Sequence, residues 1–271
     1  MAFDPGQIRD FERCGFDRAA SAYETAFAPA TRPFIPRLLD AACVGAGMDV
    51  LDLCCGPGFA GAEAMTRGAR ATGLDFSEPM LREGRARFPT MDFVHGDAEN
   101  PPFEPARFDA AVSNFGIHHV PRPALALAAM HRILRPHGKL AFSIWAGHDE
   151  NIAFKLIADA VRGFGDRDAS GAPPPGGGFA TGADCLTVLH EAGFVDAGAH
   201  LFRGVWRHRN AAAMLAAMRD GTARNAAMLA AQSPDRMPAI EAGLDQSTAP
   251  WRDTDGLAVP IACVIAYGTR P

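Results

Sequence analysis

The hydrophobic pattern of residues 48–145 alternates short apolar runs with segments whose apolar positions recur at helical spacing. Strands that alternate with helices are typical of a parallel sheet with helices on both faces. The apolar runs predict strands at 48–53, 70–75, 91–94, 108–113 and 138–145, and the segments between them predict helices at 58–67, 77–88 and 123–134.

Local signals mark two of these helix boundaries. Ser77 stands where an N-cap residue would lie, and Pro79 falls in the first turn of the helix that follows. The sequence Arg-Pro-His-Gly at 135–138 supplies a proline and a glycine that end helix 123–134.

The pattern is looser after Trp145. We expect, in order, a helix at about 181–192, a strand at 197–206, an Ala- and Met-rich helical block at 210–247 and a last strand at 259–268. The last strand, VPIACVIAYG, is nearly all apolar, which indicates a place inside the same sheet. The expected fold is therefore α/β, with a seven-stranded, mostly parallel sheet, an N-terminal helical cap and a helical insertion before the last strand.

We expect residues 1–271 to form one domain. Its expected parts are a helical cap at 1–47, a ligand-binding core at 48–145, a linker, helix and sixth strand at 146–206, a helical excursion at 207–258 and the last strand at 259–271. The stretch DRDASGAPPPGGG at 166–178 is too rich in Gly and Pro for a helix or strand. Its composition favours a linker over a mobile flap.

Composition excludes several classes of protein. The chain has 26 Lys and Arg against 31 Asp and Glu, a formal charge of −5, and no basic run of the kind that nucleic-acid binders carry. Apolar stretches such as 124–130 are far too short to span a membrane, and the N-terminus is acidic where a signal peptide would be basic and then apolar. A cytoplasmic protein without a nucleic-acid partner or a membrane span is expected, and the oligomeric state cannot be read.

The cysteines and histidines predict no metal site. The six cysteines, at 14, 43, 54, 55, 185 and 263, have neither zinc-site spacing nor the density of a disulfide scaffold, so we expect reduced and mostly buried thiols. His131 lies on a predicted helix without a second ligand at a useful spacing.

A glycine motif and three acids follow the first predicted strands. Gly56, Gly58 and Gly61 have the Gly-x-Gly-x-x-Gly spacing of a dinucleotide site. Successive strands end at or just before Asp52, Asp75 and the pair Asp97 and Glu99. Because the ligand crevice of an open parallel sheet lies beyond the carboxyl ends of its strands, this crevice should be negative.

Asp52 decides between two classes of adenosine ligand. Residues 48–66 hold no Lys or Arg, so a pyrophosphate on the glycine loop would meet this carboxylate without compensation. Two like charges ~5 Å apart repel by about 3 kcal/mol at an effective dielectric constant of ~20. An adenosine that carries positive charge near the glycines fits better, and S-adenosylmethionine carries a sulfonium and an ammonium there.

Five linked segments then resemble one family. The segments VLDLCCGPGFAG, GLDFSEPML, HGDAENPPF, FDAAVSNFGIHHV and HRILRPHGKLAFSIW resemble the class I S-adenosylmethionine-dependent methyltransferases, in particular the group with the ubiquinone and menaquinone C-methyltransferases. The resemblance runs through about residues 40–145 and implies a Rossmann-like sheet. It makes S-adenosyl-L-methionine the expected cofactor.

The resemblance also implies a set of binding residues. By position, Asp52, Cys54, Gly56 and Gly58 would line the methionine moiety, Asp75 would bind the ribose, Phe76 and Met80 would flank the adenine, Asp97 and Ala98 would meet its edge, Asn114 and Phe115 would border the sulfonium, and Tyr23 would close over the cofactor. Cys54 stands where the family more often has glycine and should crowd the loop. Packing is the alternative interpretation for Tyr23 and the apolar residues, and a tight turn is the alternative for the glycines.

Two histidines are candidates for a general base. His118 and His119 follow the fourth predicted strand, where a base would reach the substrate. Adjacent side chains diverge, so at most one of them should point into the site. A loop histidine satisfied by backbone or solvent is the alternative interpretation.

The residues after 206 give weaker candidates. Met214, Met218, Met228 and Met237 can line an adaptable apolar pocket, although composition alone favours packing on the sheet. Further pocket candidates are Trp206, Arg207, His208, Trp251 and Arg252.

The leading hypothesis is a methyltransferase that acts by direct displacement on a small, apolar metabolite and releases S-adenosylhomocysteine. Two alternatives stay open, a nicotinamide-dependent oxidoreductase and a protein that binds S-adenosylmethionine without methylating a substrate. The acceptor, and whether oxygen, carbon or nitrogen is methylated, cannot be read.

Overall fold

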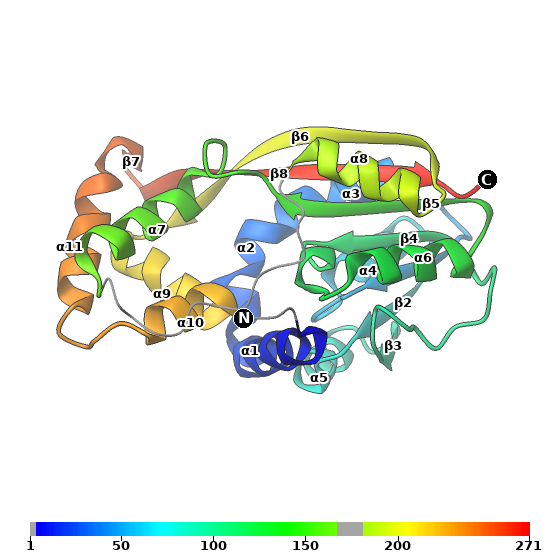
Figure 1. Cartoon of the computed structure of the whole chain (residues 1–271), viewed down its shortest axis with the longest axis horizontal. Helices are drawn as coiled ribbons and strands as arrows, with labels where there is room; N and C mark the ends of the chain where they lie inside the picture. Colours follow the sequence, from blue (N-terminus) through cyan, green and yellow to red (C-terminus); the bar gives the residue numbers. More distant parts are fainter. Residues whose placement is uncertain (1–3, 167–180) are drawn as a thin grey trace.

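A twisted eight-stranded sheet forms the centre of the computed structural model, which describes residues 4–166 and 181–271 (Figure 1). The strand order is β3-β2-β1-β4-β5-β8-β6, with the short β7 paired to β8. The strands are β1 Asp49–Leu53, β2 Arg70–Asp75, β3 Asp92–His95, β4 Phe108–Asn114, β5 Leu134–Trp145, β6 Val195–His208, β7 Arg252–Asp253 and β8 Gly256–Thr269.

The strand directions create a crevice above β1. Strands β1 to β5 are parallel, whereas β8 is antiparallel to both β5 and β6. The chain leaves β1 towards β2 and β3 and then returns to β4 on the other side of β1. Helices that connect such strands part at this switch point, and a ligand crevice opens there.

Helices cover both faces of the sheet. Side chains alternate along β1, so that Val50 packs into the hydrophobic cluster with α3 and α4, and Leu51 packs into the cluster with α6 and α8 on the opposite face. The helices are α1 Pro5–Ala26, α2 Ala28–Thr31, α3 Ile35–Ala41, α4 Phe59–Thr66, α5 Glu78–Arg87, α6 Pro123–Ile133, α7 Ile152–Phe164, α8 Gly182–Glu191, α9 Ala211–Gly221, α10 Arg224–Ala230 and α11 Met237–Ser247, with short 3-10 turns η1 Arg32–Phe34, η2 Ile117–His119 and η3 Ala249–Trp251.

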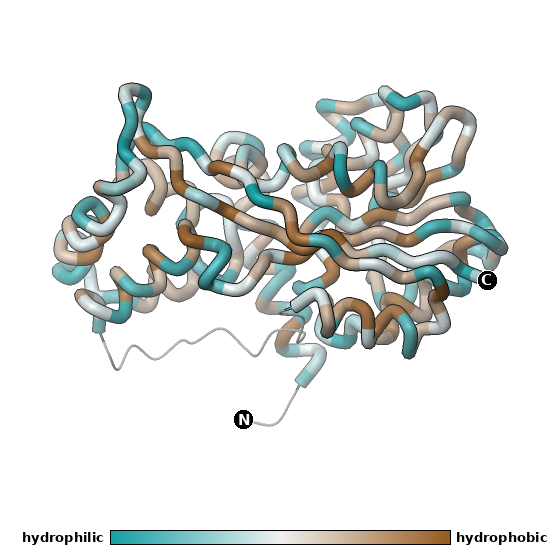
Figure 2. The backbone as a smooth tube through the Cα atoms, turned by 90° about the horizontal axis from the view of Figure 1, so that it is seen from above, coloured by the Kyte–Doolittle hydropathy of each residue, from teal (hydrophilic) through white to brown (hydrophobic). Residues whose placement is uncertain are grey.

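A second group of helices lies at one end of the molecule. Helices α7, α9, α10 and α11 lie near the C-terminal end of β6 and the N-terminal end of β8, on the left of Figure 1. Helix α1 contacts α9 and α10. Hydrophobic residues run along the central strands, and hydrophilic residues lie mainly on the outer helices and connections (Figure 2). Within the described residues no helix combines the length and the apolar character that a bilayer crossing requires.

The expected fold class is confirmed, with corrections to single elements. The sheet has an eighth strand, β7, and helix α7 was not expected. Strands β5, β6 and β8 begin earlier than predicted, because their first residues pair with residues of other strands: Leu134 with Phe108, Val195 with Thr269 and Gly256 with Asp253. Ser77 does cap α5, accepting a hydrogen bond from Met80 N at 3.3 Å.

Two expectations stay untested. Of the stretch 166–178, positions 167–178 lie outside the described residues. The division into one domain with five parts remains a prediction.

Candidate functional site

A cavity lies beyond the carboxyl ends of β1, β2 and β4, with α1 across it. Its empty space is about 1010 Å³, a figure that includes open solvent at the mouth. Clefts lined mainly by apolar and aromatic side chains with a few polar groups are typical of small-molecule sites. The predicted site residues in its lining are Tyr23, Asp52, Cys54, Gly56, Asp75, Phe76, Met80, Asp97, Ala98, Asn114, Phe115 and His119. Gly58 and His118 are not in the lining.

The loop after β1 depends on unusual backbone conformations. Cys54 and Gly56 have φ of 54° and 53°, in the left-handed region that favours glycine. A Cβ at Gly116 would lie 2.4 Å from the Cβ of Cys54, so Gly116 leaves the space that the cysteine fills. The expected crowding at Cys54 is therefore accommodated by a glycine from the loop after β4.

The other two glycines serve packing. Gly58 caps α4 with φ of 82°, and a Cβ there would lie 2.7 Å from the Phe93 ring. A Cβ at Gly61 would lie 2.2 Å from Met91 Cε. The glycine motif thus lets α4 lie close to its neighbours, and only Gly56 of the three lines the cavity.

Asp52 is 1% exposed, and its Oδ2 accepts a hydrogen bond from Gly61 N at 2.8 Å. Burial raises the pKa of Asp52 to about 8, and nearby Asp75 adds to this rise, while the bond from Gly61 opposes it. Asp52 is thus mostly protonated at neutral pH when the cavity holds no cation. The sequence predicted a permanent negative charge at Asp52. In the structure, this carboxyl would instead lose its proton when a cationic ligand binds beside it.

Asp75 joins the glycine loop to α5. Its Oδ2 accepts from Gly56 N at 2.8 Å, and its Oδ1 accepts from Ser77 N at 2.9 Å. Burial raises the pKa of Asp75 to about 6, against the lowering effect of these backbone donors. The carboxylate is therefore ionised at neutral pH.

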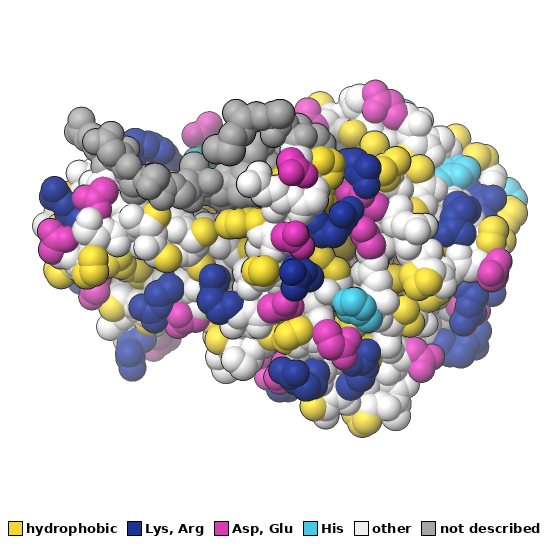
Figure 3. Space-filling view, turned by 60° about the horizontal axis from the view of Figure 1, so that its bottom comes forward, with side chains coloured by type: hydrophobic (Ala, Val, Ile, Leu, Met, Phe, Trp, Pro, Cys, Tyr) yellow, Lys and Arg dark blue, Asp and Glu magenta, His cyan; other side chains and the backbone are white. Residues whose placement is uncertain are grey.

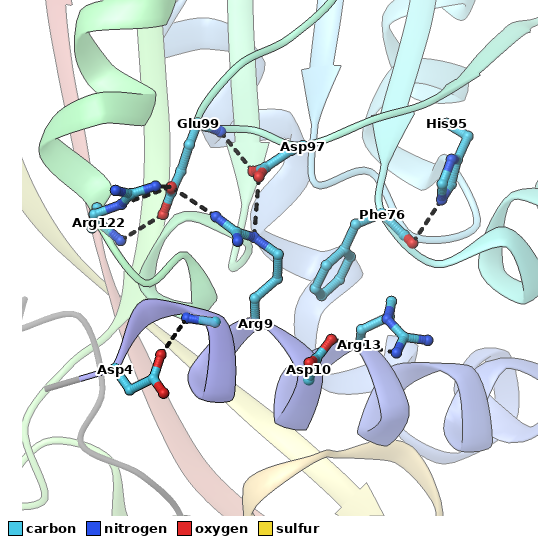
Figure 4. Close-up of polar contacts among 10 residues, drawn as sticks. Asp4, Arg9, Asp10, Arg13, Phe76, His95, Asp97, Glu99 and Arg122 are labelled. Carbon is cyan, nitrogen blue, oxygen red and sulfur yellow. Dashed lines mark hydrogen bonds and ion pairs between the residues drawn. The ribbon is translucent and has the colours of Figure 1, made fainter. Parts of the chain in front are cut away.

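Asp97 is tied to α1 through Arg9, which sequence reasoning missed (Figure 4). Arg9 forms ion pairs of 3.0 Å with Asp97 Oδ2 and 2.8 Å with Glu99 Oε2. Arg122 also donates to Glu99, and Glu99 N donates to Asp97 Oδ1 at 2.9 Å. Among the described residues Arg9 is the one Arg or Lys in the lining, and its charge is engaged by these acids. On the face of the molecule shown in Figure 3, acidic and basic side chains are interspersed.

Aromatic side chains form the other wall of the cavity. Phe115 stacks on Trp145 with ring centroids 3.9 Å apart, and the Phe27 ring meets Trp145 edge-on at 5.9 Å. Phe115 has φ of 58°, and its N donates to Ser143 Oγ at 2.9 Å. Burial raises the pKa of Tyr23 to about 12, so this wall is uncharged.

The helical insertion does not reach the cavity. Met214 and Met218 are fully buried in the core cluster, together with Trp206, and Met228 and Met237 pack against that cluster. Within the described residues none of these side chains, nor Arg207, His208, Trp251 or Arg252, is in the lining. Packing is therefore the correct interpretation of the methionines.

The structure separates the two histidines. His119 lines the cavity, and its Nδ1 lies 3.0 Å from Glu12 Oε2 of α1. His118 is half-buried outside the lining, where desolvation, together with His119 and Arg224, holds its pKa well below the usual value.

Several functional candidates on α1 and elsewhere were missed. Arg9, Phe16, Phe27 and Trp145 line the cavity, and Glu12 contacts His119. One signal was available: Arg9, Glu12, Phe16 and Tyr23 recur at helical spacing, which puts two charged residues on the helix face that also carries aromatic rings.

The core of the chain is similar to known protein families. A family model described as a methyltransferase domain matches residues 50–138. A demethylmenaquinone methyltransferase of Paenarthrobacter aurescens is 38% identical over 113 residues, which are 42% of this chain and 45% of the relative. One of Staphylococcus aureus is 42% identical over 98 residues, 34% of this chain and 41% of the relative. The matched segment spans less than half the length of these curated relatives.

Solved structures share the fold over most of the chain. A methyltransferase of Bacillus halodurans has a TM-score of 0.58 at 21% identity and covers 88% of this chain and 98% of its own. Phosphoethanolamine N-methyltransferase 2 of Haemonchus contortus, solved with S-adenosylhomocysteine, has a TM-score of 0.61 at 18% identity over 97% of this chain and 60% of its own. At these identities the likeness shows the fold alone.

Proposed function

We propose that this chain, whose core is a class I S-adenosylmethionine-dependent methyltransferase domain of the quinone methyltransferase group, is an enzyme that methylates a small, apolar acceptor. The resemblance seen in the sequence motifs is confirmed at the level of this domain. The activity of the whole chain, its cofactor and its acceptor are inferred from the cavity.

One observation carries the proposal. The strands β1 and β2 and the loop after β3 bring Asp52, Asp75 and Asp97 to a single cavity, whose one Arg or Lys among the described residues is already paired. A sulfonium and an ammonium are stabilised by such a site, because either charge favours the ionised form of Asp52. The pyrophosphate of a nicotinamide cofactor would find no free cation beside the glycine loop, which argues against the oxidoreductase alternative.

We assign each part of S-adenosylmethionine to particular residues of the cavity. Asp52 and the backbone of Cys54 and Gly56 would hold the methionine end, and Asp75 would accept hydrogen bonds from the ribose. Phe76 and Met80 would flank the adenine, with Asp97 and Ala98 at its edge. Asn114 and Phe115 would border the sulfonium, with Tyr23 closing over it. Gly58 would act only through the loop and helix that it shapes.

The aromatic residues that line the cavity favour a planar, uncharged acceptor. Tyr23, Phe27, Phe115 and Trp145 present flat, uncharged faces, which suit a planar aromatic ring. The curated relatives are named as demethylmenaquinone methyltransferases. A reduced naphthoquinone is therefore the acceptor class that we propose. Alignment of the methyl group with the attacking atom can contribute on the order of 7–11 kcal/mol to such a displacement.

The first test is ligand binding. S-adenosylhomocysteine, S-adenosylmethionine and NAD are each titrated calorimetrically into the wild-type protein and the Asp52→Asn variant. Micromolar binding of the two adenosyl ligands and none of NAD is expected, and Asp52→Asn should weaken S-adenosylmethionine at least tenfold. Binding of NAD alone, or unchanged S-adenosylmethionine affinity in the variant, would refute the proposal.

The second test separates an enzyme from a binding protein. The protein is incubated with S-adenosylmethionine labelled in its methyl group and with dithionite-reduced 2-prenyl-1,4-naphthoquinone. Transfer of label to the naphthohydroquinone supports methylation, and binding without transfer to this or other phenolic acceptors supports the non-methylating alternative. A cytoplasmic location and the lack of a nucleic-acid partner remain predictions of the sequence.

A further inference from the structure

Three elements far apart in the chain meet at His119. The ring belongs to η2 after β4, and its Nδ1 lies 3.0 Å from Glu12 Oε2 of α1. The other oxygen of Glu12 lies 2.5 Å from Arg224 Nε of α10. The Glu12 side chain is 0% exposed and the His119 side chain 21%, so the carboxylate is enclosed while the ring reaches the cavity.

The charge of Glu12 fixes which ring nitrogen carries the proton. Burial alone would raise the pKa of Glu12, but His119 and Arg224 outweigh it and hold this pKa below its usual value. An ionised carboxylate only accepts hydrogen bonds, so Nδ1 of His119 must donate to it. In the neutral ring Nε2 then keeps its lone pair, and within the described residues no hydrogen bond occupies that nitrogen.

We propose that Glu12 is a positioning residue that sets His119 as the general base of methyl transfer, with Nε2 turned towards the acceptor, and that Arg224 holds Glu12 in place. This inference rests on the proposed function and narrows its substrate class to acceptors with an acidic O–H, such as a hydroquinone or phenol. The Phe16 ring meets the imidazole edge-on at 4.9 Å and limits its rotation.

The proton and electron balance is simple. As the acceptor attacks, its O–H proton passes to Nε2 of His119. In methylation at oxygen, a lone pair of the resulting oxyanion forms the new O–C bond to the methyl carbon. In methylation at a ring carbon, a π electron pair of the oxyanion's ring forms the new C–C bond, and the proton on that ring carbon is then lost to water, which restores the aromatic ring and the O–H group. The bond between sulfur and carbon breaks, and its pair stays on sulfur, which becomes neutral. The resulting imidazolium is stabilised by Glu12 until it loses its proton to water.

Other charged groups surround the ring. His118 lies beside it, with ring centroids 4.2 Å apart, and stays neutral because burial lowers its pKa. Arg224 disfavours a second positive charge, whereas Glu12 favours it. Arg9 and Asp97 line the same cavity and are paired with each other. Glu12 is thus the negative group in direct contact with His119.

The test compares Glu12→Gln with Glu24→Gln, a matched control on the same helix, where Glu24 pairs with Arg87 at the surface. Ring ¹⁵N spectra of the full chain with S-adenosylhomocysteine give the tautomer and pH titration of His119, assigned through His119→Asn. Methylation of reduced 2-prenyl-1,4-naphthoquinone gives kcat and KM against pH. Circular dichroism and S-adenosylhomocysteine affinity confirm folding.

For the wild-type protein and Glu24→Gln we expect protonated Nδ1 and free Nε2. In Glu12→Gln the tautomer preference should be lost, and kcat should fall at least tenfold with KM within threefold. Glu12→Asp, which keeps the charge, should recover part of kcat. If Glu12→Gln does not fold, the double variant Glu12→Gln/Arg224→Met provides the same comparison with both members of the ion pair replaced.

The outcomes separate the two proposals. An unchanged tautomer or unchanged kcat in Glu12→Gln, or a wild-type His119 whose proton is on Nε2 and not on Nδ1, overturns the role of Glu12 while methyl transfer stands. If the wild-type protein methylates no phenolic acceptor but the ring spectra behave as expected, the acceptor class fails and the positioning of His119 stands.

Discussion

Cys54 and Gly116 form a matched pair of residues at the mouth of the cavity. Cys54 holds a left-handed conformation that a glycine would adopt more easily, and its Cβ fills the space that the absent side chain of Gly116 leaves. Sequence reasoning identified the unusual cysteine but not its partner, because the two lie in the loops after β1 and β4, which only the fold brings together.

The pairing predicts a coupled effect on stability. Gly116→Ala should lower the free energy of unfolding by about 1–3 kcal/mol, because the new methyl group would overlap Cys54. In a Cys54→Gly background the same change should cost less, although contact with Ser113 would remain. Urea unfolding of the four proteins in this cycle measures the coupling. Equal costs in both backgrounds would show that the two residues are independent.

Helix α1 is the element that completes the site. It supplies Arg9, Glu12, Phe16 and Tyr23 from one face, and Asp17 of the same helix accepts a hydrogen bond from Ser77 Oγ at 2.6 Å. Its contacts run both to α5 of the core and to α9 and α10 of the helical insertion.

The contact of α1 with the core predicts a modest effect on affinity. Arg9→Gln should weaken S-adenosylhomocysteine two- to fivefold, since partly exposed ion pairs contribute about 0.2–1 kcal/mol, and the loss should shrink in high salt. Arg13→Gln is the control, because the ion pairs of Arg13 among residues 4–166 and 181–271 are with Asp10 and Asp17 of its own helix. Calorimetric titration at two salt concentrations measures both. An equal loss in the two variants would exclude a specific role for Arg9.

Elements with strong local signals were predictable, and those defined by long-range contacts were not. The strands β1, β2 and β4, the cap at Ser77 and the acids at strand ends follow from periodicity and spacing. The start of β5 at Leu134 and the two-residue β7 depend on pairing with distant strands, which no local pattern encodes. The aromatic wall was missed for the same reason, since Phe27 and Trp145 look like core residues until the sheet places them beside Phe115.

At the scale of the whole molecule, the buried acids of the site oppose folding at neutral and alkaline pH. Burial raises the pKa of Asp52 from 3.8 to about 8 and that of Asp75 to about 6, so each stabilises the fold below pH 4 and loses this contribution as pH rises through its folded pKa. Half-buried histidines such as His118 and His208, whose pKa values are lowered by desolvation, act in the opposite direction, but only below about pH 6.5, where the unfolded chain gains their protons.

Between pH 7 and 8 Asp52 is therefore the main titrating group of the fold. We expect the free energy of unfolding to fall by about 1 kcal/mol over this unit, close to the limit of about 1.4 kcal/mol for one proton. Asp52→Asn should remove most of this slope, leaving a small loss from the buried thiols of Cys54 and Cys55, whose pKa values are raised. Saturating S-adenosylmethionine should also reduce this pH dependence, because a bound cation favours the ionised carboxylate.

Urea unfolding of both proteins at the two pH values, with and without this ligand, measures the pH dependence of the free energy of unfolding. If Asp52→Asn keeps the wild-type slope, then Asp52 is already ionised in the folded protein, and the link between its proton and the bound cation is lost.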